Sequence, residues 1–256
     1  MENLEGMVRY WQEHPEWMEM MDPASPVHRD KLLERALYLD MWEPYLPTDG
    51  SVLDLGGGVG RLAETLLGRN CEVQLVDPDL RSLWRAMAMV AGGPGRIDIH
   101  WTTGERLPPL PPLQTAIACE VLNYVEDPEA VVANVHRALE PGGHFLLSVE
   151  AKWGWAMAAD AAEGTIGSFL DGDVVHVPRD RWIRTYDRKE LETLLSDFVI
   201  IGIRPSHYAL SGPFELAAGR MEPMEAIRLE EQLRTHPVAG QLNRAWMAVA
   251  RKETGK

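Results

Sequence analysis

The chain has 256 residues, of which 45% are apolar and 25% are charged, and its formal net charge is −14. This composition suffices for a full hydrophobic core and excludes an intrinsically disordered chain. The acidic balance also argues against a protein that binds nucleic acid or an anionic membrane surface, since both partners select a dense basic footprint.

The amino-terminal residues lack the basic and apolar regions of a signal peptide, and no apolar run reaches the roughly 18 residues of a membrane span. Cys71 and Cys119 do not form a CxxC pair, so neither a disulfide scaffold nor a thiolate metal site is expected. We therefore expect a cytoplasmic protein without a metal ion. The sequence leaves its oligomeric state open.

Residues 1–28 are rich in tryptophan, methionine and acidic groups, and three prolines among them interrupt any long helix. Apolar residues then recur at helical spacing from Asp30 to Tyr45, where Asp30 is a plausible N-cap. Pro44 and Pro47 mark the end of this expected helix.

Strands then alternate with helices up to residue 149. We expect strands at 51–55, 72–76, 96–101, 115–119 and 144–149, and helices at 61–67, 80–90 and 128–138. Loops are expected at 92–95 and at Pro141-Gly142-Gly143. This alternation predicts a parallel sheet with helices on both faces.

The rhythm changes after Glu150. Residues 151–184 and 205–243 form two long excursions, separated by an expected helix at 188–195 and a strand at 198–203. A last strand is expected at 245–250. We interpret residues 30–256 as one sheet domain with cap insertions at 151–184 and 205–243, and residues 1–29 as an amino-terminal lid.

The clearest motif lies after the first expected strand, where residues 54–60 read Asp-Leu-Gly-Gly-Gly-Val-Gly. A glycine turn between strand and helix lets the backbone approach a ligand closely. Residues 58–63 also fit the G-x-G-x-x-A pattern of dinucleotide-binding proteins. Asp54 argues against that ligand, because a pyrophosphate would meet a carboxylate there, whereas an ammonium group would be attracted.

Asp77 ends the second expected strand. A carboxylate there can accept hydrogen bonds from both hydroxyls of a ribose. The alternative is that Asp77 is only the N-cap of the helix that begins near Leu80.

Four motifs occur in an order that is informative as a whole. They are the glycine turn at 54–60, Val-Asp-Pro-Asp at 76–79, the segments Glu-Val-Leu-Asn-Tyr-Val-Glu-Asp-Pro at 120–128 and Arg-Ala-Leu-Glu-Pro-Gly-Gly at 137–143, and Tyr-Asp-Arg-Lys-Glu-Leu at 186–191. In this order the chain resembles the class I S-adenosylmethionine-dependent methyltransferases, in the branch that includes the ubiquinone and menaquinone methyltransferases. The resemblance covers about residues 30–150 and continues at 185–203 and 245–252.

The resemblance implies an α/β fold with a Rossmann-like, doubly wound, mostly parallel seven-stranded sheet and helical cap insertions. It implies S-adenosyl-L-methionine as the cofactor. Thr103 stands where the family often has an aspartate for the adenine amino group. The residues expected to bind the cofactor are Tyr10, Asp54, Gly56, Gly58, Asp77, Pro78, Thr103, Gly104, Glu105, Cys119 and Glu120.

The eight histidines show no spacing typical of metal ligands. His14, His28, His176 and His207 lie in segments that could cover the cofactor, and we name the first three as candidate catalytic residues. A surface or packing role is the competing interpretation of each.

The sequence therefore predicts methyl transfer from S-adenosylmethionine to a small, partly apolar acceptor in specialised (natural-product) metabolism. The alternatives are a non-catalytic nucleotide-binding protein and an NAD(P)-dependent oxidoreductase. The identity of the acceptor and of its methylated atom is not legible from the sequence.

Overall fold

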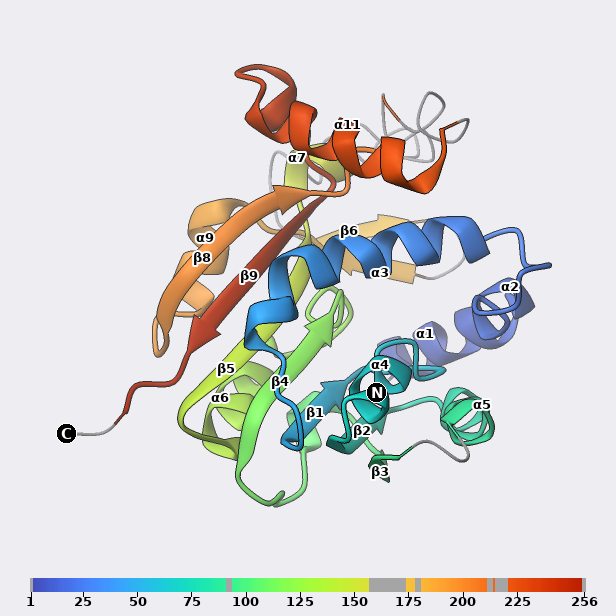
Figure 1. Ribbon diagram of the computed structural model, residues 1–256, viewed down its shortest axis with the longest axis vertical. Helices are drawn as coiled ribbons and strands as arrows, with labels where there is room; N and C mark the ends of the chain where they lie inside the picture. The colour runs from blue at the N-terminus through green and yellow to red at the C-terminus, as the bar shows by residue number, and fades with distance from the viewer. Residues whose placement is uncertain are drawn as a thin grey trace. The chain divides into compact units, whose positions relative to one another are not determined.

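The computed structural model of the chain describes residues 2–90, 94–156, 174–177, 181–210, 214 and 221–254 (Figure 1). The helices are α1 (Glu2–Gln12), α2 (Pro15–Met18), α3 (His28–Trp42), α4 (Ala63–Gly68), α5 (Leu80–Val90), α6 (Pro128–Ala138), α7 (Lys152–Ala156), α9 (Arg188–Leu194) and α11 (Pro223–Thr235). Short 3₁₀ turns are η1 (Glu43–Tyr45), η2 (Gly104–Arg106) and η4 (Ala239–Gln241).

The strands are β1 (Ser51–Leu55), β2 (Glu72–Asp77), β3 (Arg96–Trp101), β4 (Leu113–Cys119), β5 (Leu139–Glu150), β6 (Val174–Val177), β7 (Arg181–Arg184), β8 (Val199–Ser206) and β9 (Ala245–Arg251). Seven of them form one sheet in the order β3-β2-β1-β4-β5-β9-β8. The pairs β1–β2, β1–β4, β2–β3 and β4–β5 are parallel.

Strand β9 runs in the opposite direction to its neighbour β5. The amide of Gly142, near the start of β5, donates to the carbonyl of Lys252 after β9, and the amide of Ala151, after β5, donates to Arg244 before β9. These two bonds join opposite ends of the strands, so β9 runs antiparallel to β5. The predicted Rossmann-like, mostly parallel seven-stranded sheet is confirmed.

The central strands of the sheet are buried at successive positions. Val52 and Leu53 of β1 are fully buried, and so are Leu75 of β2 and Ala116 and Ala118 of β4. Strands covered by helices on both faces need apolar side chains at successive positions instead of alternating ones. This is why 51–55 and 115–119 could be recognised as strands.

The chain divides into two compact units. The first unit consists of Met1–Met41, Val149–Leu191 and Ile203–Met247, and the second of Trp42–Ser148, Glu192–Gly202 and Ala248–Lys256. In the first unit, α1 lies beside β7, and its Met7 side chain is 1% exposed. The prediction of a lid at 1–29 and of cap insertions at 151–184 and 205–243 stays a prediction.

One local expectation is wrong. The turn expected at 141–143 belongs to β5. The pairing of β4 with β5 shifts register between Leu113 and Thr115, so the extra residues of β5 form an irregularity within the strand. Gly142 adopts φ +88° there. The excursion at 151–184 contains a hairpin, in which Val174 of β6 pairs with Arg184 of β7. Residues 157–173 and 178–180 of this excursion, and 91–93 of the expected loop at 92–95, lie outside the described residues.

Candidate functional site

The glycine turn follows β1 directly (Figure 1). It belongs to the second unit. Gly56 has φ +64°, and a Cβ atom there would lie 2.4 Å from Cγ2 of Val121. Gly58 has φ +53° and open space around its missing Cβ. Only glycine combines the left-handed conformation at Gly56 with so close a packing. The amides of Gly56 and Gly57 donate to the carbonyl of Val76 at 2.7 and 3.3 Å, so hydrogen bonds to the neighbouring strand hold the turn.

Asp54 lies beneath this turn, at the penultimate position of β1. Its side chain is 3% exposed, and a Cβ atom at Gly57 would lie 2.8 Å from its Cγ. Burial raises the pKa of Asp54 to about 7, Arg61 and the amide of Ala63 oppose the rise, and Asp77 adds to it. Its Oδ2 atom is buried without a hydrogen-bond partner among the described residues. A ligand with a positively charged donor would satisfy it.

Asp77 ends β2 and holds the turn from the other side. Its Oδ2 accepts a hydrogen bond from the amide of Gly58 at 3.0 Å, and its Oδ1 accepts one from the amide of Asp79 at 2.8 Å. Burial raises the pKa of Asp77 to about 7, although both of these bonds lower it. Because each carboxylate oxygen has two lone pairs, both oxygens can accept a further hydrogen bond.

The alternative role of Asp77 as N-cap of α5 belongs to Asp79 instead. The side chain of Asp79 accepts hydrogen bonds from the amide of Ser82 at 3.1 Å and from its hydroxyl at 2.7 Å. Asp77 is therefore not needed to begin the helix. The carbonyl of Pro78 between them accepts a hydrogen bond from the indole of Trp101 at 2.9 Å.

The loop after β3 is fixed by the side chain of Asn134 on α6. Its amide nitrogen donates to the carbonyls of Gly104 at 2.9 Å and Glu105 at 3.0 Å. A Cβ atom at Gly104 would lie 2.9 Å from Val131 on the same helix. The carboxylate of Glu105 accepts a hydrogen bond from the amide of Glu126 at 3.0 Å. Thr103, which precedes η2, lies on a loop that is held in place on both sides.

Cys119 ends β4 and Glu120 follows it with φ +57°, an unusual conformation for a residue with a long side chain. The amide of Glu120 donates to the carbonyl and to the hydroxyl of Ser148 on β5, at 3.0 and 3.1 Å. These bonds to the neighbouring strand hold the strained residue. Backbone strain of this kind is concentrated at functional sites.

The predicted catalytic histidines lie in the first unit. The ring of His14 stacks on that of Tyr10 with centroids 4.1 Å apart, and its Nδ1 lies 2.6 Å from the Tyr10 carbonyl. The Nδ1 of His28 lies 3.0 Å from the carbonyl of Met20. Since a carbonyl only accepts, Nδ1 carries the proton in both rings, and a neutral ring then has its acceptor at Nε2. For His176 the described part is its place in β6, opposite Trp182.

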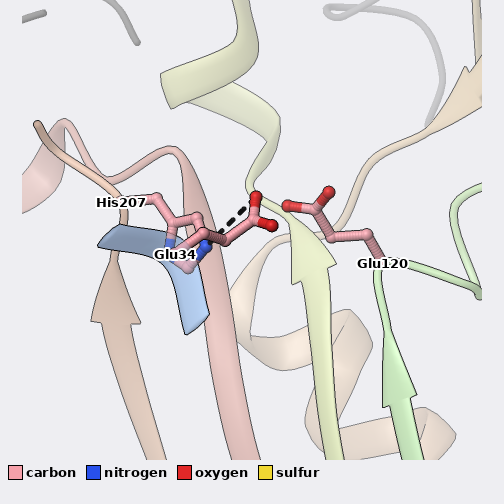
Figure 2. Close-up of side chains that lie close together, drawn as sticks. All are labelled: Glu34, Glu120 and His207. Carbon is pink, nitrogen blue, oxygen red and sulfur yellow. Dashed lines mark ion pairs between the residues drawn. The ribbon is translucent and has the colours of Figure 1, made fainter. Parts of the chain in front are cut away.

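Two further residues of the first unit form a buried pair. The sequence places His207 in a segment that could cover the cofactor, whereas no sequence pattern indicated its partner Glu34. His207 follows β8 with φ +67°, is 2% exposed, and places its Nε2 4.0 Å from Oε1 of Glu34 on α3 (Figure 2). Lys31 donates to both carboxylate oxygens of Glu34, at 2.9 and 3.0 Å. The ring of Tyr38 lies 5.3 Å from that of His207. A buried histidine beside a carboxylate is typical of acid–base sites.

Glu230 on α11 supports the main chain at this point. Its carboxylate is 2% exposed and accepts a hydrogen bond from the amide of Ala209 at 2.7 Å. Burial raises the pKa of Glu230 to about 7, and hydrogen bonds from the amides of Ala209, His207 and Tyr208 oppose the rise. One buried carboxyl group thus holds the strained turn that carries His207. A positive φ becomes visible only in coordinates, so no sequence pattern indicated it.

The residues of the second unit fit S-adenosylmethionine. The unsatisfied Oδ2 of Asp54 suits its ammonium group, the glycine turn offers space beside Gly58, and Asp77 has acceptor capacity for ribose hydroxyls. Among the described residues no helix is both long enough and apolar enough to cross a membrane.

A family profile described as "Methyltransferase domain" matches residues 27–198, which is more than half of the chain. The ubiquinone biosynthesis O-methyltransferase of Idiomarina loihiensis is 30% identical over 158 residues, covering 57% of this chain and 65% of that protein. The corresponding protein of Xylella fastidiosa is 31% identical over 137 residues, covering 52% and 53%. The chain thus spans less than two thirds of the length of these relatives.

Solved structures agree with the fold. The 1,6-didemethyltoxoflavin-N1-methyltransferase of Burkholderia thailandensis, solved with 1,6-didemethyltoxoflavin and S-adenosylhomocysteine, has a TM-score of 0.61 at 19% identity, covering 98% of this chain and 89% of that chain. A methyltransferase from Methanosarcina mazei has a TM-score of 0.58 at 17% identity, covering 83% and 97%. The resemblance seen in the ordered motifs is confirmed, and the chain belongs to the methyltransferase domain family, among its class I S-adenosylmethionine-dependent members.

Proposed function

We propose that the protein transfers the methyl group of S-adenosylmethionine to a small, partly apolar acceptor in specialised (natural-product) metabolism. The observation that carries this proposal is the buried carboxylate of Asp54, with Oδ2 unsatisfied among the described residues, directly beneath the glycine turn. An ammonium group would give this carboxylate a partner, whereas the pyrophosphate of a dinucleotide would be repelled. Membership of the methyltransferase domain family supports the same cofactor.

The proposed cofactor-binding residues of the second unit contact different parts of S-adenosylmethionine. Asp54 and the glycine turn at Gly56 and Gly58 hold the amino-acid end of the cofactor, which lies in the space beside Gly58. Asp77 accepts hydrogen bonds from the ribose, with Pro78 beside it. When bound, S-adenosylmethionine supplies an electrophilic methyl group on a sulfonium sulfur.

The remaining cofactor residues surround the adenine. Thr103, Gly104 and Glu105 lie along one side of it, on the loop that Asn134 fixes. Cys119 and Glu120 form the wall beneath it. A loop and a strained strand end that are both held by hydrogen bonds orient the reactants with little loss of entropy on binding.

The acceptor needs a group that removes its proton if the methylated atom is a hydroxyl oxygen. His207, beside Glu34, is our first candidate, because a carboxylate stabilises the imidazolium ring that forms when histidine takes a proton. His14 and His28 remain candidates, since Nε2 is the acceptor of each neutral ring. Residues 1–29, with Tyr10 against the cofactor, and the excursions at 151–184 and 205–243 are proposed to cover the acceptor and exclude water.

Isothermal titration calorimetry with S-adenosylhomocysteine and with NAD tests the cofactor. Micromolar binding of the first and none of the second is expected. Binding of NAD alone would replace this proposal with an oxidoreductase.

Turnover is tested by mass spectrometry on a panel that begins with catechols and simple phenols, because the curated relatives are named as O-methyltransferases. A mass gain of one methyl group on an acceptor is expected. Tight cofactor binding without turnover on oxygen, nitrogen, carbon or sulfur acceptors would instead indicate a non-catalytic nucleotide-binding protein.

A further inference from the structure

Helix α5 of the second unit is apolar on two sides. Its Leu83 and Ala86 are 1% and 0% exposed and face the core. Leu80, Trp84 and Met87 follow each other at i, i+4 and i+7 on another side, and they are 42%, 64% and 47% exposed. A wide apolar side of a helix that is left exposed indicates a surface that a partner covers.

The last strand of the sheet continues this surface. Trp101 at the end of β3 is 67% exposed, and its indole is fixed by the hydrogen bond to Pro78, two residues before α5. We call the four side chains Leu80, Trp84, Met87 and Trp101 the α5–β3 surface. At their exposures the two indoles present about 300 Å² and the whole surface about 500 Å², at the upper end for an apolar patch on a monomer.

Strand β3 also has an open edge, because it stands at one end of the strand order of the described sheet. The amide of Arg96 donates to Cys71 beside β2, so the backbone groups of Arg96, Asp98 and His100 face β2. The N–H and C=O groups of Ile97, Ile99 and Trp101 therefore point to the open edge. The strand contains no proline or lysine of the kind that natural edge strands use to prevent pairing, and its two charged residues, Arg96 and Asp98, form an ion pair with each other at 3.1 Å.

We propose that the protein forms a two-fold symmetric dimer in which β3 pairs antiparallel with β3 of a second copy and the α5–β3 surfaces cover each other. The strand matches itself when Ile99 lies opposite Ile99. Ile97 is then opposite Trp101, a favourable pair of a β-branched and an aromatic residue, and the carboxylate of Asp98 is opposite the ring of His100. With Asp98 at the centre instead, two carboxylates would face each other.

The composition of the surface indicates a protein partner. Tryptophan, methionine and arginine are enriched at the centre of protein interfaces and lysine and glutamate are depleted, and α5 adds the exposed Arg81 and Arg85 to this surface. Together with the strand edge, these side chains approach the roughly 800 Å² per subunit of a stable interface. An anionic membrane is disfavoured as the partner by the net charge of −14.

Sedimentation velocity of the full chain tests the oligomeric state. A dimer is expected at about 10 µM and above, and Trp84→Glu combined with Met87→Glu should give a monomer that still unfolds cooperatively, with a Tm that no longer rises with protein concentration. Met224→Glu is the matched control, since Met224 on α11 is 62% exposed and lies outside the surface. A monomeric wild-type chain, or a dimer that the double substitution leaves intact, would overturn the proposal.

Single cysteines test the register. Residues on a two-fold axis in paired strands have Cα atoms about 5.5 Å apart, within the range of a disulfide. Ile99→Cys should therefore form a disulfide-linked dimer under mild oxidation, whereas Ile97→Cys and the unsubstituted chain should not. Linkage through Ile97→Cys alone would refute this register. If a monomer bound phosphatidylglycerol vesicles and Trp84→Glu abolished that binding, the surface would be assigned to a membrane and the dimer proposal would be wrong.

Discussion

Replacing Asp54 by asparagine should stabilise the protein without its cofactor and weaken cofactor binding. The pKa of Asp54 rises from 3.8 to about 7 in the folded chain, chiefly because the carboxyl group is buried. Between these two pH values the folded state holds a proton that the unfolded state has released, so stability falls as the pH rises, and the full cost is present above about pH 7. A shift of this size corresponds to roughly 4 kcal/mol.

An asparagine has the same shape and carries no charge at any pH. Part of the gain is offset because the favourable interaction of the carboxylate with Arg61 is lost. We therefore expect Asp54→Asn to raise the free energy of unfolding by about 2–4 kcal/mol at pH 8, with the difference vanishing near pH 4. Affinity for S-adenosylhomocysteine should fall by the roughly 1.5–3 kcal/mol of a charged hydrogen bond.

Urea denaturation at pH 4, 6 and 8 measures the stability, and calorimetry measures the affinity. Asp197→Asn, at an exposed position in the second unit, is the matched control and should change neither quantity. A variant that is less stable than the wild type at pH 8, or equally stabilised at pH 4 and pH 8, would refute the assignment of a buried charge to Asp54. Gain of stability with loss of binding is the pattern expected where function requires an unfavourable group.

Four further results are expected. At pH 6 cofactor binding should release up to about one proton, because Asp54 must ionise to pair with an ammonium group. Calorimetry in buffers of different ionisation enthalpy measures the number of protons released, and proton release that persists in Asp54→Asn would contradict this prediction. Asp77→Asn should weaken the binding of S-adenosylhomocysteine and of adenosine alike by at least about tenfold. Asp54→Asn should leave adenosine binding unchanged, because adenosine has no ammonium group. Equal losses of affinity in both variants would argue against separate roles. Among His14→Asn, His28→Asn, His176→Asn and His207→Asn, the variant of the true base should lower kcat by about 10²–10⁴ with cofactor affinity preserved, and Glu34→Gln should follow His207→Asn if that pair is the base. Tyr10→Ala should lower cofactor affinity without changing thermal unfolding if residues 1–29 act as a lid, and unchanged affinity and turnover would remove that idea.

The sequence alone was enough to predict the parts of the protein that depend on neighbouring residues. A buried strand, a glycine turn and a helix follow one another between residues 51 and 68, so Asp54, Gly56 and Gly58 could be named without coordinates. The parallel sheet followed in the same way from the alternation of strands and helices, because each βαβ unit closes on itself locally.

Residues far apart in the chain required the tertiary structure. Glu34 and His207 lie on an early helix and after a late strand, and Glu230 supports His207 from a third element. Asp77 and Asp79 have the same residue type two positions apart, so only the hydrogen bonds show that Asp79 caps α5 while Asp77 holds the glycine turn. Likewise, the exposed side of α5 has the same apolar pattern as a buried side of a helix. Its exposure depends on the position of β3 as the end strand of the described sheet. Local patterns specify which element forms, whereas packing between distant segments decides which polar groups are buried together and which apolar groups remain for a partner.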